Sequence, residues 1–339
     1  MVTVAVAGVA HIHTPGFIKK LKERQDVSFK YIWDPVKERA QKRSAEVGVK
    51  VVASANKIFN DPEVQAVVIC SETNLHKKLV LKAAAAKKHM FVEKPLGLGA
   101  KDGYAMAQAI EQAGLLYQTG YAQRCGAINL FLKAQIQAGN FGKITRARGS
   151  SCHSGSLGGW FDDKPQDPAN SWRWMADPKI AGCGAYGDLG THSLDILIWL
   201  LGDVEKVAAQ IGAVTDRYPG CDEFGEGMLK FKNGCVATLA SSWVDQANPV
   251  SLLISGTEGH AVVFNGQLYF TSKKVQGADG KQPWTQLPAA LPSPLDLFLD
   301  AVGGKQGLPL VTAREAAYRS SVMEALYQAN KNGKWVVPK

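Results

Sequence analysis

The sequence lacks several features that mark common structural classes. Its 339 residues contain no run approaching 18 apolar residues, which predicts no membrane-spanning helix. The six cysteines, at 70, 125, 152, 183, 221 and 235, show no C-x-x-C and no metal-ligand spacing, so we expect reduced, mostly buried thiols. The first residues have no basic segment, apolar core and cleavage site of a signal peptide, and we therefore expect a cytoplasmic protein.

Charge is abundant, but like charges are not clustered. The formal net charge is +9, yet no block of five or six like charges occurs, so the sequence predicts no nucleic-acid partner. Attraction of an anionic cofactor or substrate is a sufficient explanation of the positive balance. The length and the 46% apolar content predict a large core divided between two domains.

Residues 1–121 alternate strand and helix signals at short spacing. Apolar-periodic segments separate five strand candidates, which are Thr3–Ala7, Val27–Trp33, Ala66–Cys70, Met90–Glu93 and Leu116–Thr119. This alternation predicts a Rossmann-type domain, an α/β fold with a doubly wound parallel sheet covered by helices on both faces.

Residues 122–339 show a different pattern. A helix candidate at 127–138 precedes strand candidates at 143–152, 204–214, 228–231, 235–243, 251–255 and 261–264, with short turns between the later ones. We expect an α+β domain with an open-faced, mainly antiparallel sheet, whose bare face predicts a homodimer or homotetramer. Residues 154–170 predict a long loop on the substrate side, and Thr312 to Glu315 fit a capping box before a final helix.

The triplet Glu93-Lys94-Pro95 follows a predicted buried strand. A lysine at the carboxyl end of a parallel strand lies where open α/β sheets bind ligands. Lys94 can hold its charge beside a cofactor, or exchange a proton if burial lowers its pKa. The alternative is a surface lysine before a proline that ends the strand.

A glycine-rich segment, 181–195, leads into an apolar-periodic helix candidate. On a helix Asp188, His192, Asp195 and Trp199 fall at i, i+4, i+7 and i+11 and share one face. That face would carry acid–base groups. The alternative makes Asp188 a helix N-cap and His192 a buried, hydrogen-bonded histidine.

The turn after the first strand keeps one glycine of the pattern G-x-G-x-x-G. Gly8 is present, whereas Ala10 and His13 occupy the other two glycine positions. His11 and His13 could contact a pyrophosphate or a nicotinamide, or they could have a structural role. A metal site is the third alternative, but no carboxylate or cysteine accompanies the two imidazoles locally, and we expect none.

Asp34 ends the second predicted strand, 26 residues after Gly8. A carboxylate there accepts hydrogen bonds from the adenine ribose and repels a 2′-phosphate, which favours NAD over NADP. Lys37 or Arg39 leaves NADP possible. The alternative role of Asp34 is to cap the helix candidate 35–47.

Together these motifs resemble the Gfo/Idh/MocA family, the glucose–fructose oxidoreductase and inositol dehydrogenase group. The matching stretches are 4–16, 67–95, Trp172-Arg173, 182–195 and 312–337. The resemblance implies an NAD-dependent, or alternatively NADP-dependent, enzyme that oxidises a secondary hydroxyl of a sugar, sugar derivative or cyclitol, or reduces the matching ketone. It also implies a cis peptide at Lys94-Pro95.

The resemblance also implies roles for individual residues. His192 would be the general base, Lys94 would orient the hydroxyl, and Asp188 would position substrate and histidine. The implied cofactor contacts are Gly8, Ala10, His11, His13, Asp34, Arg39, Ser71, Thr73, Asn74, His76, Glu93, Lys94 and Gln123, although the family usually has proline where Thr73 stands. The implied substrate contacts are Lys94, Arg124, Trp172, Arg173, Asp188 and His192, with salt-bridge or packing roles as the alternative for the arginines.

Two other functions fit the same residues. One is a lyase, epimerase or glycosidase that retains NAD and returns the hydride to its own product. The other is a non-catalytic sugar-sensing protein on the same fold. The presence of Lys94, Asp188 and His192 together argues against a sensor, because a sensor needs no proton relay.

Overall fold

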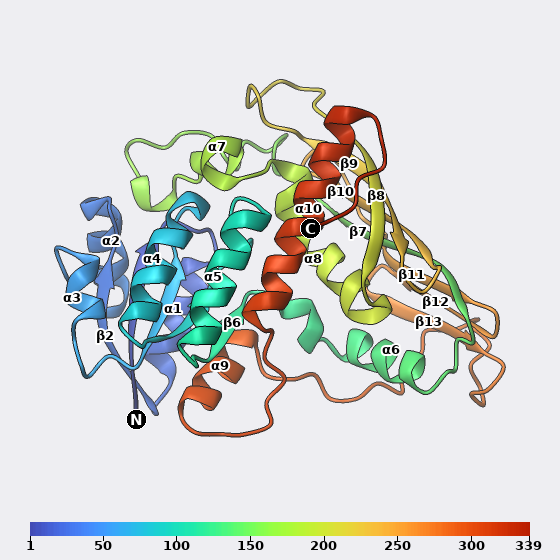
Figure 1. Cartoon of the computed structure of the whole chain (residues 1–339), viewed down its shortest axis with the longest axis horizontal. Coiled ribbons are helices and arrows are strands. Elements are labelled where there is room, and N and C mark those ends of the chain that lie inside the picture. Colours follow the sequence, from blue (N-terminus) through green and yellow to red (C-terminus); the bar gives the residue numbers. More distant parts are fainter. The chain divides into compact units, whose positions relative to one another are not determined.

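The computed structural model describes residues 1–339, which form two compact units (Figure 1). Unit 1 contains residues 1–120, 161–182 and 293–320, and unit 2 contains residues 121–160, 183–292 and 321–339. The first crossing between units falls next to the expected boundary at 121/122. Two segments that we expected in the second domain belong instead to unit 1.

Unit 1 is built on a six-stranded sheet with the order β3-β2-β1-β4-β5-β6. Every neighbouring pair is parallel, which confirms the doubly wound sheet. The strands are β1 Val2–Val9, β2 Val27–Trp33, β3 Lys50–Val51, β4 Ala66–Cys70, β5 His89–Val92 and β6 Tyr117–Thr119. Only β3 was not predicted, because two residues are too few to show a periodicity.

The helices of unit 1 pack on this sheet or against one another. They are α1 Thr14–Glu23, α2 Lys37–Val47, α3 Ala55–Phe59, α4 Thr73–Ala85, α5 Ala100–Gln112, α7 Pro178–Ala181 and α9 Pro294–Val302. Ile18 of α1 and Phe298 of α9 are buried in one cluster with Val4 and Val6 of β1. The apolar face of α9 is therefore part of this core, which explains why residues 293–320 belong to unit 1.

The segment 161–182 is tied to α2. The buried Arg43 guanidinium donates to Ala169 O at 2.6 Å and to Asn170 Oδ1 at 2.8 Å. Lys42 pairs with Asp167 at 2.7 Å. These contacts assign the second half of the predicted long loop to unit 1, and no local sequence signal could have shown them.

Unit 2 contains a seven-stranded sheet with the order β13-β12-β11-β7-β10-β9-β8. Its strands are β7 Ile144–Cys152, β8 Val204–Gly212, β9 Phe224–Phe231, β10 Val236–Ser242, β11 Val250–Gly256, β12 Gly259–Phe264 and β13 Gln267–Ser272. Only β7 and β10 pair in parallel, so the sheet is mainly antiparallel, as expected. The unpredicted β13 follows a turn at Asn265-Gly266, where both residues have positive φ.

Three longer helices belong wholly or partly to unit 2. They are α6 Ala127–Gln137, α8 Ala185–Leu201 and α10 Ala313–Asn332. The capping box before α10 is confirmed, because Thr312 N donates to Glu315 Oε2 at 2.9 Å and Glu315 N donates to Thr312 Oγ1 at 3.1 Å.

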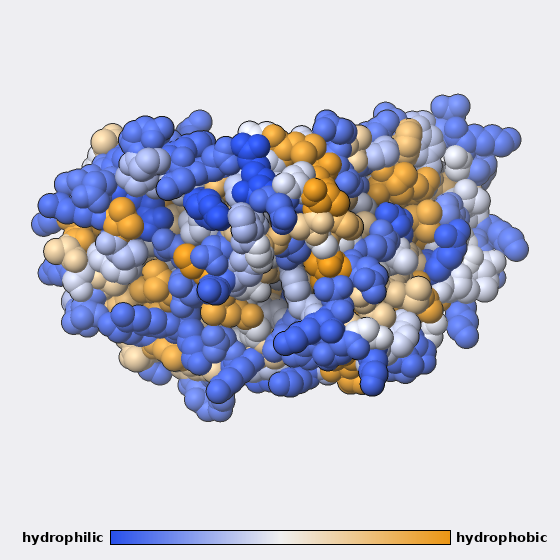
Figure 2. Space-filling model, turned by 90° about the horizontal axis from the view of Figure 1, so that it is seen from above, coloured by the Kyte–Doolittle hydropathy of each residue, from blue (hydrophilic) through white to orange (hydrophobic).

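The surface mixes apolar and charged residues. On the face seen in Figure 2, apolar residues lie in separate patches among hydrophilic ones. None of the helices is both long enough and apolar enough to cross a membrane. All six cysteines are free thiols.

Candidate active site

The turn after β1 has the backbone geometry that the glycine pattern predicts. Gly8 has φ +94°, and a Cβ at this position would lie 2.4 Å from Ser71 Cβ at the end of β4. Only glycine allows this approach. The next helix, α1, has His13 as N-cap and no side chain capping its first amide groups. Thr14 N–H donates to His11 O at 3.0 Å and Pro15 has no N–H, so a phosphate here would meet the Gly8 turn and the remaining backbone amide groups.

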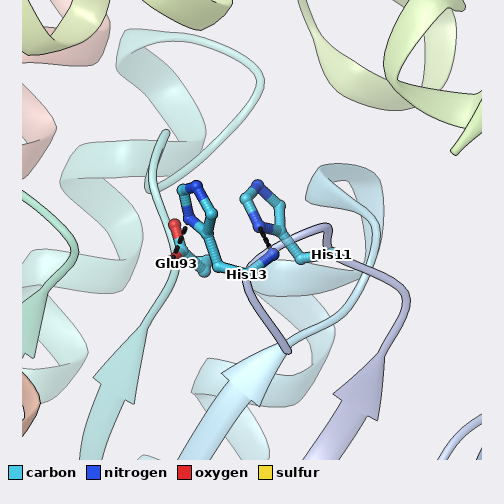
Figure 3. A group of neighbouring side chains, drawn as sticks. All are labelled: His11, His13 and Glu93. Carbon is cyan, nitrogen blue, oxygen red and sulfur yellow. Dashed lines mark hydrogen bonds and ion pairs between the residues drawn. The ribbon is translucent and has the colours of Figure 1, made fainter. Parts of the chain in front are cut away.

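His11 and His13 lie beside Glu93, which directly follows β5 (Figure 3). His13 Nδ1 is 3.1 Å from Glu93 Oε1, and His11 Nδ1 accepts the His13 N–H at 3.3 Å. The two imidazole centroids are 4.6 Å apart. A carboxylate therefore does accompany the histidines, but it comes from 80 residues further along the chain.

Glu93 is a buried, ionised carboxylate. Burial favours its protonation, but the charges of His11 and His13, the hydrogen bond from His13 and the charge of Lys94 together hold the pKa of Glu93 well below its usual range. Glu93 Oε2 accepts the Lys94 N–H at 2.9 Å. Lys94 is itself buried, and the Lys94-Pro95 peptide is cis, as the resemblance implies.

The same three residues could hold a metal ion. Their donor atoms lie within 4.8 Å of one another, and two imidazoles with a carboxylate suit zinc or another divalent transition metal. An ion would displace the His13–Glu93 contact and the hydrogen bond to His11. The arrangement is already a hydrogen-bonded network, and the expectation of no metal stays a prediction.

Asp34, at the end of β2, is buried and bonded within the protein. Oδ2 accepts the Val9 N–H at 2.7 Å, and Oδ1 accepts the Val36 N–H and Arg39 Nε, both at 2.8 Å. Burial raises the pKa of Asp34 despite the Arg39 charge. Its expected contact with the ribose stays a prediction, since these bonds give it a structural role as well.

A cavity of about 580 Å³ lies beside Asp34. Lys37 lines it, whereas Arg39 is buried and also binds Glu72 Oε1 at 2.6 Å. Lys37, and not Arg39, is therefore the cation that could contact the 2′-phosphate of an NADP bound in this cavity. The other lining residues are Trp33, Pro35, Ala40, Gln41, Val51, Val52 and Ala53.

The predicted cofactor residues after β4 differ in burial and in their contacts. Ser71 and Thr73 are buried and Asn74 is exposed. His76 is buried, with Nδ1 at 3.2 Å from Pro95 O and Leu96 O and Nε2 at 3.3 Å from Ser71 O. Burial lowers the pKa of His76, so the ring is neutral. A neutral imidazole has one N–H, so the ring donates either to the carbonyls at the Pro95 turn or to the Ser71 carbonyl after β4. This is a structural role that the sequence did not separate from cofactor contact.

Residues 172–174 add three further side chains to unit 1. Trp172 has a buried indole N–H with no hydrogen-bond partner, and Lys164 Nζ lies over its ring, 5.4 Å from the centroid. Arg173 Nη1 donates to Ala176 O at 3.0 Å. Trp174 was not predicted, yet its Nε1 donates to Ala10 O at 3.2 Å. Its proximity in sequence to Trp172 is the one signal that could have identified it.

In unit 2, α8 begins at Ala185, and its N-terminus is capped by Asp222, which lies outside the glycine-rich segment 181–195. Asp222 accepts the N–H groups of Gly184 at 3.1 Å and Tyr186 at 2.7 Å. Tyr327 OH donates to Asp222 at 2.8 Å. The alternative reading of Asp188 as the N-cap is wrong, because Asp188 lies inside the first turn. Asp222 was missed, since a single acid in a loop carries no signal.

Asp188 and His192 lie one turn apart on α8, and both side chains are partly exposed. The Tyr121 ring stands edge-on to His192 at 6.3 Å, and its hydroxyl is 3.0 Å from Thr191 Oγ1. Tyr121 was not predicted. The structure thus places a carboxylate and an imidazole one turn apart on α8, with the Tyr121 ring beside the imidazole.

The second acid of this face, Asp195, is already paired. Asp195 is fully buried and accepts from Arg124 Nε at 2.8 Å and Arg124 Nη2 at 2.6 Å. The alternative salt-bridge role of Arg124 is therefore confirmed. Gln123 is exposed, and its carbonyl accepts from Gly126 N at 3.2 Å and Asn129 Nδ2 at 2.9 Å.

Two named relatives are similar to most of this chain. A levoglucosan dehydrogenase of Pseudarthrobacter phenanthrenivorans is 28% identical over 61% of this chain and 57% of its own length. A myo-inositol 2-dehydrogenase of Thermotoga maritima is 28% identical over 70% of this chain and 68% of its own. The chain thus spans little more than half the length of the first of them.

A solved structure shares the fold along the whole chain. Levoglucosan dehydrogenase, in complex with NADH and levoglucosan, superposes with a TM-score of 0.80 and 20% identity, covering 100% of both chains.

Family models match both units of the chain. The model of an oxidoreductase family with an NAD-binding Rossmann fold matches residues 2–121. The model of the GFO/IDH/MocA C-terminal domain matches residues 130–262. These matches agree with the Gly8 turn, the Glu93-Lys94-Pro95 triplet and the α8 motif, and the chain belongs to the GFO/IDH/MocA family of NAD-binding oxidoreductases.

Proposed function

We propose that this protein is an NAD-dependent dehydrogenase of a sugar, sugar derivative or cyclitol. The observation that carries the proposal is the buried Glu93–Lys94 pair beside the first turn of an NAD-binding domain. Relatives named for levoglucosan and myo-inositol support the substrate class, because both substrates are polyhydroxylated rings.

Several features of unit 1 suit NAD. We assign the pyrophosphate to the Gly8 turn and the uncapped start of α1, with His11, His13, Ala10 and Ser71 around it. The adenosine end would occupy the cavity beside Asp34, which Lys37 lines, while Arg39 holds the Asp34 carboxylate through a 2.8 Å hydrogen bond. The family resemblance also assigns cofactor contacts to Thr73, Asn74, His76 and Gln123.

NAD, when bound, supplies the hydride acceptor. The protein must then orient the substrate and remove the hydroxyl proton. We assign the base to His192, whose ordinary pKa is near neutrality. Lys94 would orient the reacting oxygen and stabilise its developing negative charge, while Asp188 would position substrate and His192. The lowered pKa of Glu93 supports its part as the carboxylate that balances the Lys94 charge.

Substrate contacts are assigned to Trp172 and Arg173 as well as to the three reacting residues. The family resemblance carries the assignment of Trp172, whose indole N–H is buried and has no partner within the protein. For Arg124 we propose a structural role and no substrate contact, since its guanidinium pairs with Asp195 in the middle of α8.

The deciding experiment is a screen of sugars, anhydrosugars and cyclitols with NAD and NADP, followed as absorbance of the reduced nicotinamide. We expect turnover with NAD on a polyhydroxylated ring. Turnover of substrate without added cofactor and without net reduction of NAD would indicate the NAD-retaining lyase, epimerase or glycosidase instead. Binding of a sugar with no turnover would indicate a sensor.

We further propose a cytoplasmic homodimer or homotetramer that pairs through the outer face of the unit 2 sheet. Alternate residues along β9 point to opposite faces. One set is buried, including Leu229, whereas Phe224 and Met228 of the other set are exposed. Phe264 of β12 is also exposed. Apolar side chains of this size on a sheet face favour burial against a second copy.

A further inference from the structure

The loop 153–160 of unit 2 presents an exposed indole on a well-bonded support. Trp160 is 46% exposed, although large apolar side chains are normally buried. The His153 ring lies against it, with centroids 4.7 Å apart and a 35° angle between planes. The imidazole therefore packs at a tilt against the indole, and we call this pair of rings the aromatic platform.

Backbone hydrogen bonds attach this loop to the end of the sheet. His153 N donates to Ser242 O at 2.9 Å, and Ser156 N donates to Trp243 O at 2.9 Å. Trp160 N donates to Gly155 O at 3.0 Å, which closes the loop on itself. The indole is therefore held by a fixed backbone and not by a free chain.

A buried carboxylate strengthens the attachment. Ser156 Oγ donates to Glu223 Oε1 at 3.1 Å, and Glu223 Oε2 accepts the Val214 and Thr215 amide groups at 2.8 and 2.7 Å. Burial of Glu223 favours its protonation, but these hydrogen bonds and that of the Thr215 hydroxyl hold its pKa below the ordinary value. The carboxylate stays ionised and cross-links two loops.

Gly155 fits the platform because it has no side chain. A Cβ there would lie 2.5 Å from His153 Cε1 and 3.1 Å from Trp160 Cε3. His153 Nδ1 also accepts the Gly155 N–H at 2.9 Å, which fixes the imidazole plane. The loop thus wraps the edges of both rings and leaves the indole exposed.

The loop starts at the end of the sheet that faces the beginning of α8. Cys152, the last residue of β7, pairs with Ser242 of β10. The adjacent Ser241 Oγ donates at 2.9 Å to the carbonyl of Ala185, the first residue of α8. Asp188 and His192 both lie in the first half of that helix.

We propose that the aromatic platform stacks against the C–H face of the substrate ring and sets its orientation. Aromatic faces carry negative charge density and attract polarised C–H groups, while the indole buries apolar ring area. A pyranose or cyclitol has one face rich in C–H groups, which a flat indole fits. The inference rests on the proposed dehydrogenase function and names a substrate-specificity residue for it.

The test compares Trp160→Ala with Trp160→Phe and with a matched control. Trp335→Ala removes an indole of equal exposure, 45%, which lies over Lys206 instead. We expect Trp160→Ala to raise KM for the best ring substrate about two- to tenfold with kcat nearly unchanged. Trp160→Phe should recover most of the difference, and Trp335→Ala should change neither constant.

Direct binding provides a readout that does not depend on turnover. Saturation-transfer NMR should show the ring C–H protons of that substrate receiving magnetisation from the unmodified protein and much less from Trp160→Ala. If no sugar or cyclitol is turned over by the unmodified protein, the proposed function fails. If turnover occurs and Trp160→Ala keeps KM and saturation transfer, the platform alone is wrong. A changed oligomer mass with unchanged KM would overturn it too, because the indole would then be a subunit contact.

Discussion

At the scale of single residues, neighbours distant in sequence decide the ionisation of Glu93. Burial alone would favour the protonated acid, yet His11, His13 and Lys94 hold the pKa of this carboxyl low. The ionised form can then balance a lysine charge that would otherwise be costly to bury. Glu93 thereby keeps Lys94 available as a cation beside the expected cofactor site.

Replacement of the reacting residues tests the chemistry. Lys94→Ala and His192→Ala should each lower kcat by about 10²-fold or more, the usual scale for a positioned acid–base group. NAD affinity, measured by titration, should change little. The double variant should lose less than the product of the single losses, because residues acting together are not additive.

The matched control for this comparison is His260→Ala. His260 lies on β12, where its Nδ1 bonds Ser255 Oγ at 2.9 Å. It should keep normal turnover. Near-full activity of either Lys94→Ala or His192→Ala on the true substrate would mean that the residue is structural and that the assigned mechanism is wrong.

Cofactor choice is the second prediction at this scale. NAD should bind more tightly than NADP, because the Asp34 carboxylate repels a 2′-phosphate. Asp34→Ala should reduce the difference between the affinities for NAD and NADP. The variant should also have a free energy of unfolding lower by about 1–3 kcal/mol, since the Val9 and Val36 amide groups lose their acceptor. Titration with both nucleotides and denaturant unfolding give the two readouts.

The variant Lys37→Ala distinguishes the role of Lys37 from that of Arg39. If NADP binds through Lys37, which lines the cavity, the variant should bind NADP more weakly and NAD with unchanged affinity. Equal affinities for NAD and NADP in the unmodified protein would remove the basis for the assignment of Asp34.

At the scale of elements, buried hydrogen bonds connect loops to strand ends. Asp222 caps α8, His76 lies between the Pro95 turn and the end of β4, and Glu223 anchors the platform loop. Each polar side chain satisfies backbone groups that would otherwise be buried without partners. These residues stabilise the positions of motif residues without belonging to any motif.

His76 makes stability depend on pH. Its pKa is lowered in the folded protein, so the neutral ring contributes stability above the ordinary value of about 6.5, and this contribution is lost as the pH falls below that value. A tenfold difference in proton affinity between the folded and unfolded chains corresponds to about 1.4 kcal/mol. Denaturant unfolding at pH 7, 6 and 5 should show a falling free energy of unfolding.

The variant His76→Gln identifies the source of that fall. The amide that replaces the imidazole cannot take up a proton, so the decrease between pH 7 and pH 5 should be smaller in the variant. His89 and His260 also have lowered pKa values and should supply the remainder. An identical pH profile in the variant and the unmodified protein would show that His76 does not contribute.

At the scale of the whole molecule, the outer face of the unit 2 sheet is where association is expected. Met228→Asp places a charge among the exposed apolar residues of this face and should shift the mass in solution toward the monomer. Light scattering after size exclusion measures that mass. Val214→Asp, at an apolar residue that is more exposed but lies outside the strands, is the control and should leave the mass unchanged.

A monomeric mass for the unmodified protein at micromolar concentration would contradict the proposed oligomer. It would not affect the fold or the proposed dehydrogenase function, because both are argued from contacts within a single chain.

The sequence by itself determined the strand pattern of both domains, the Gly8 turn, the capping box at Thr312 and the family motifs. These depend on periodicity and on local backbone chemistry, which a sequence carries directly. Only the tertiary structure decided that Glu93 meets His13, that Asp222 caps α8, and that residues 161–182 pack with α2. Each of these contacts joins groups far apart in the chain, so it exists only once the order of the strands has placed their ends together.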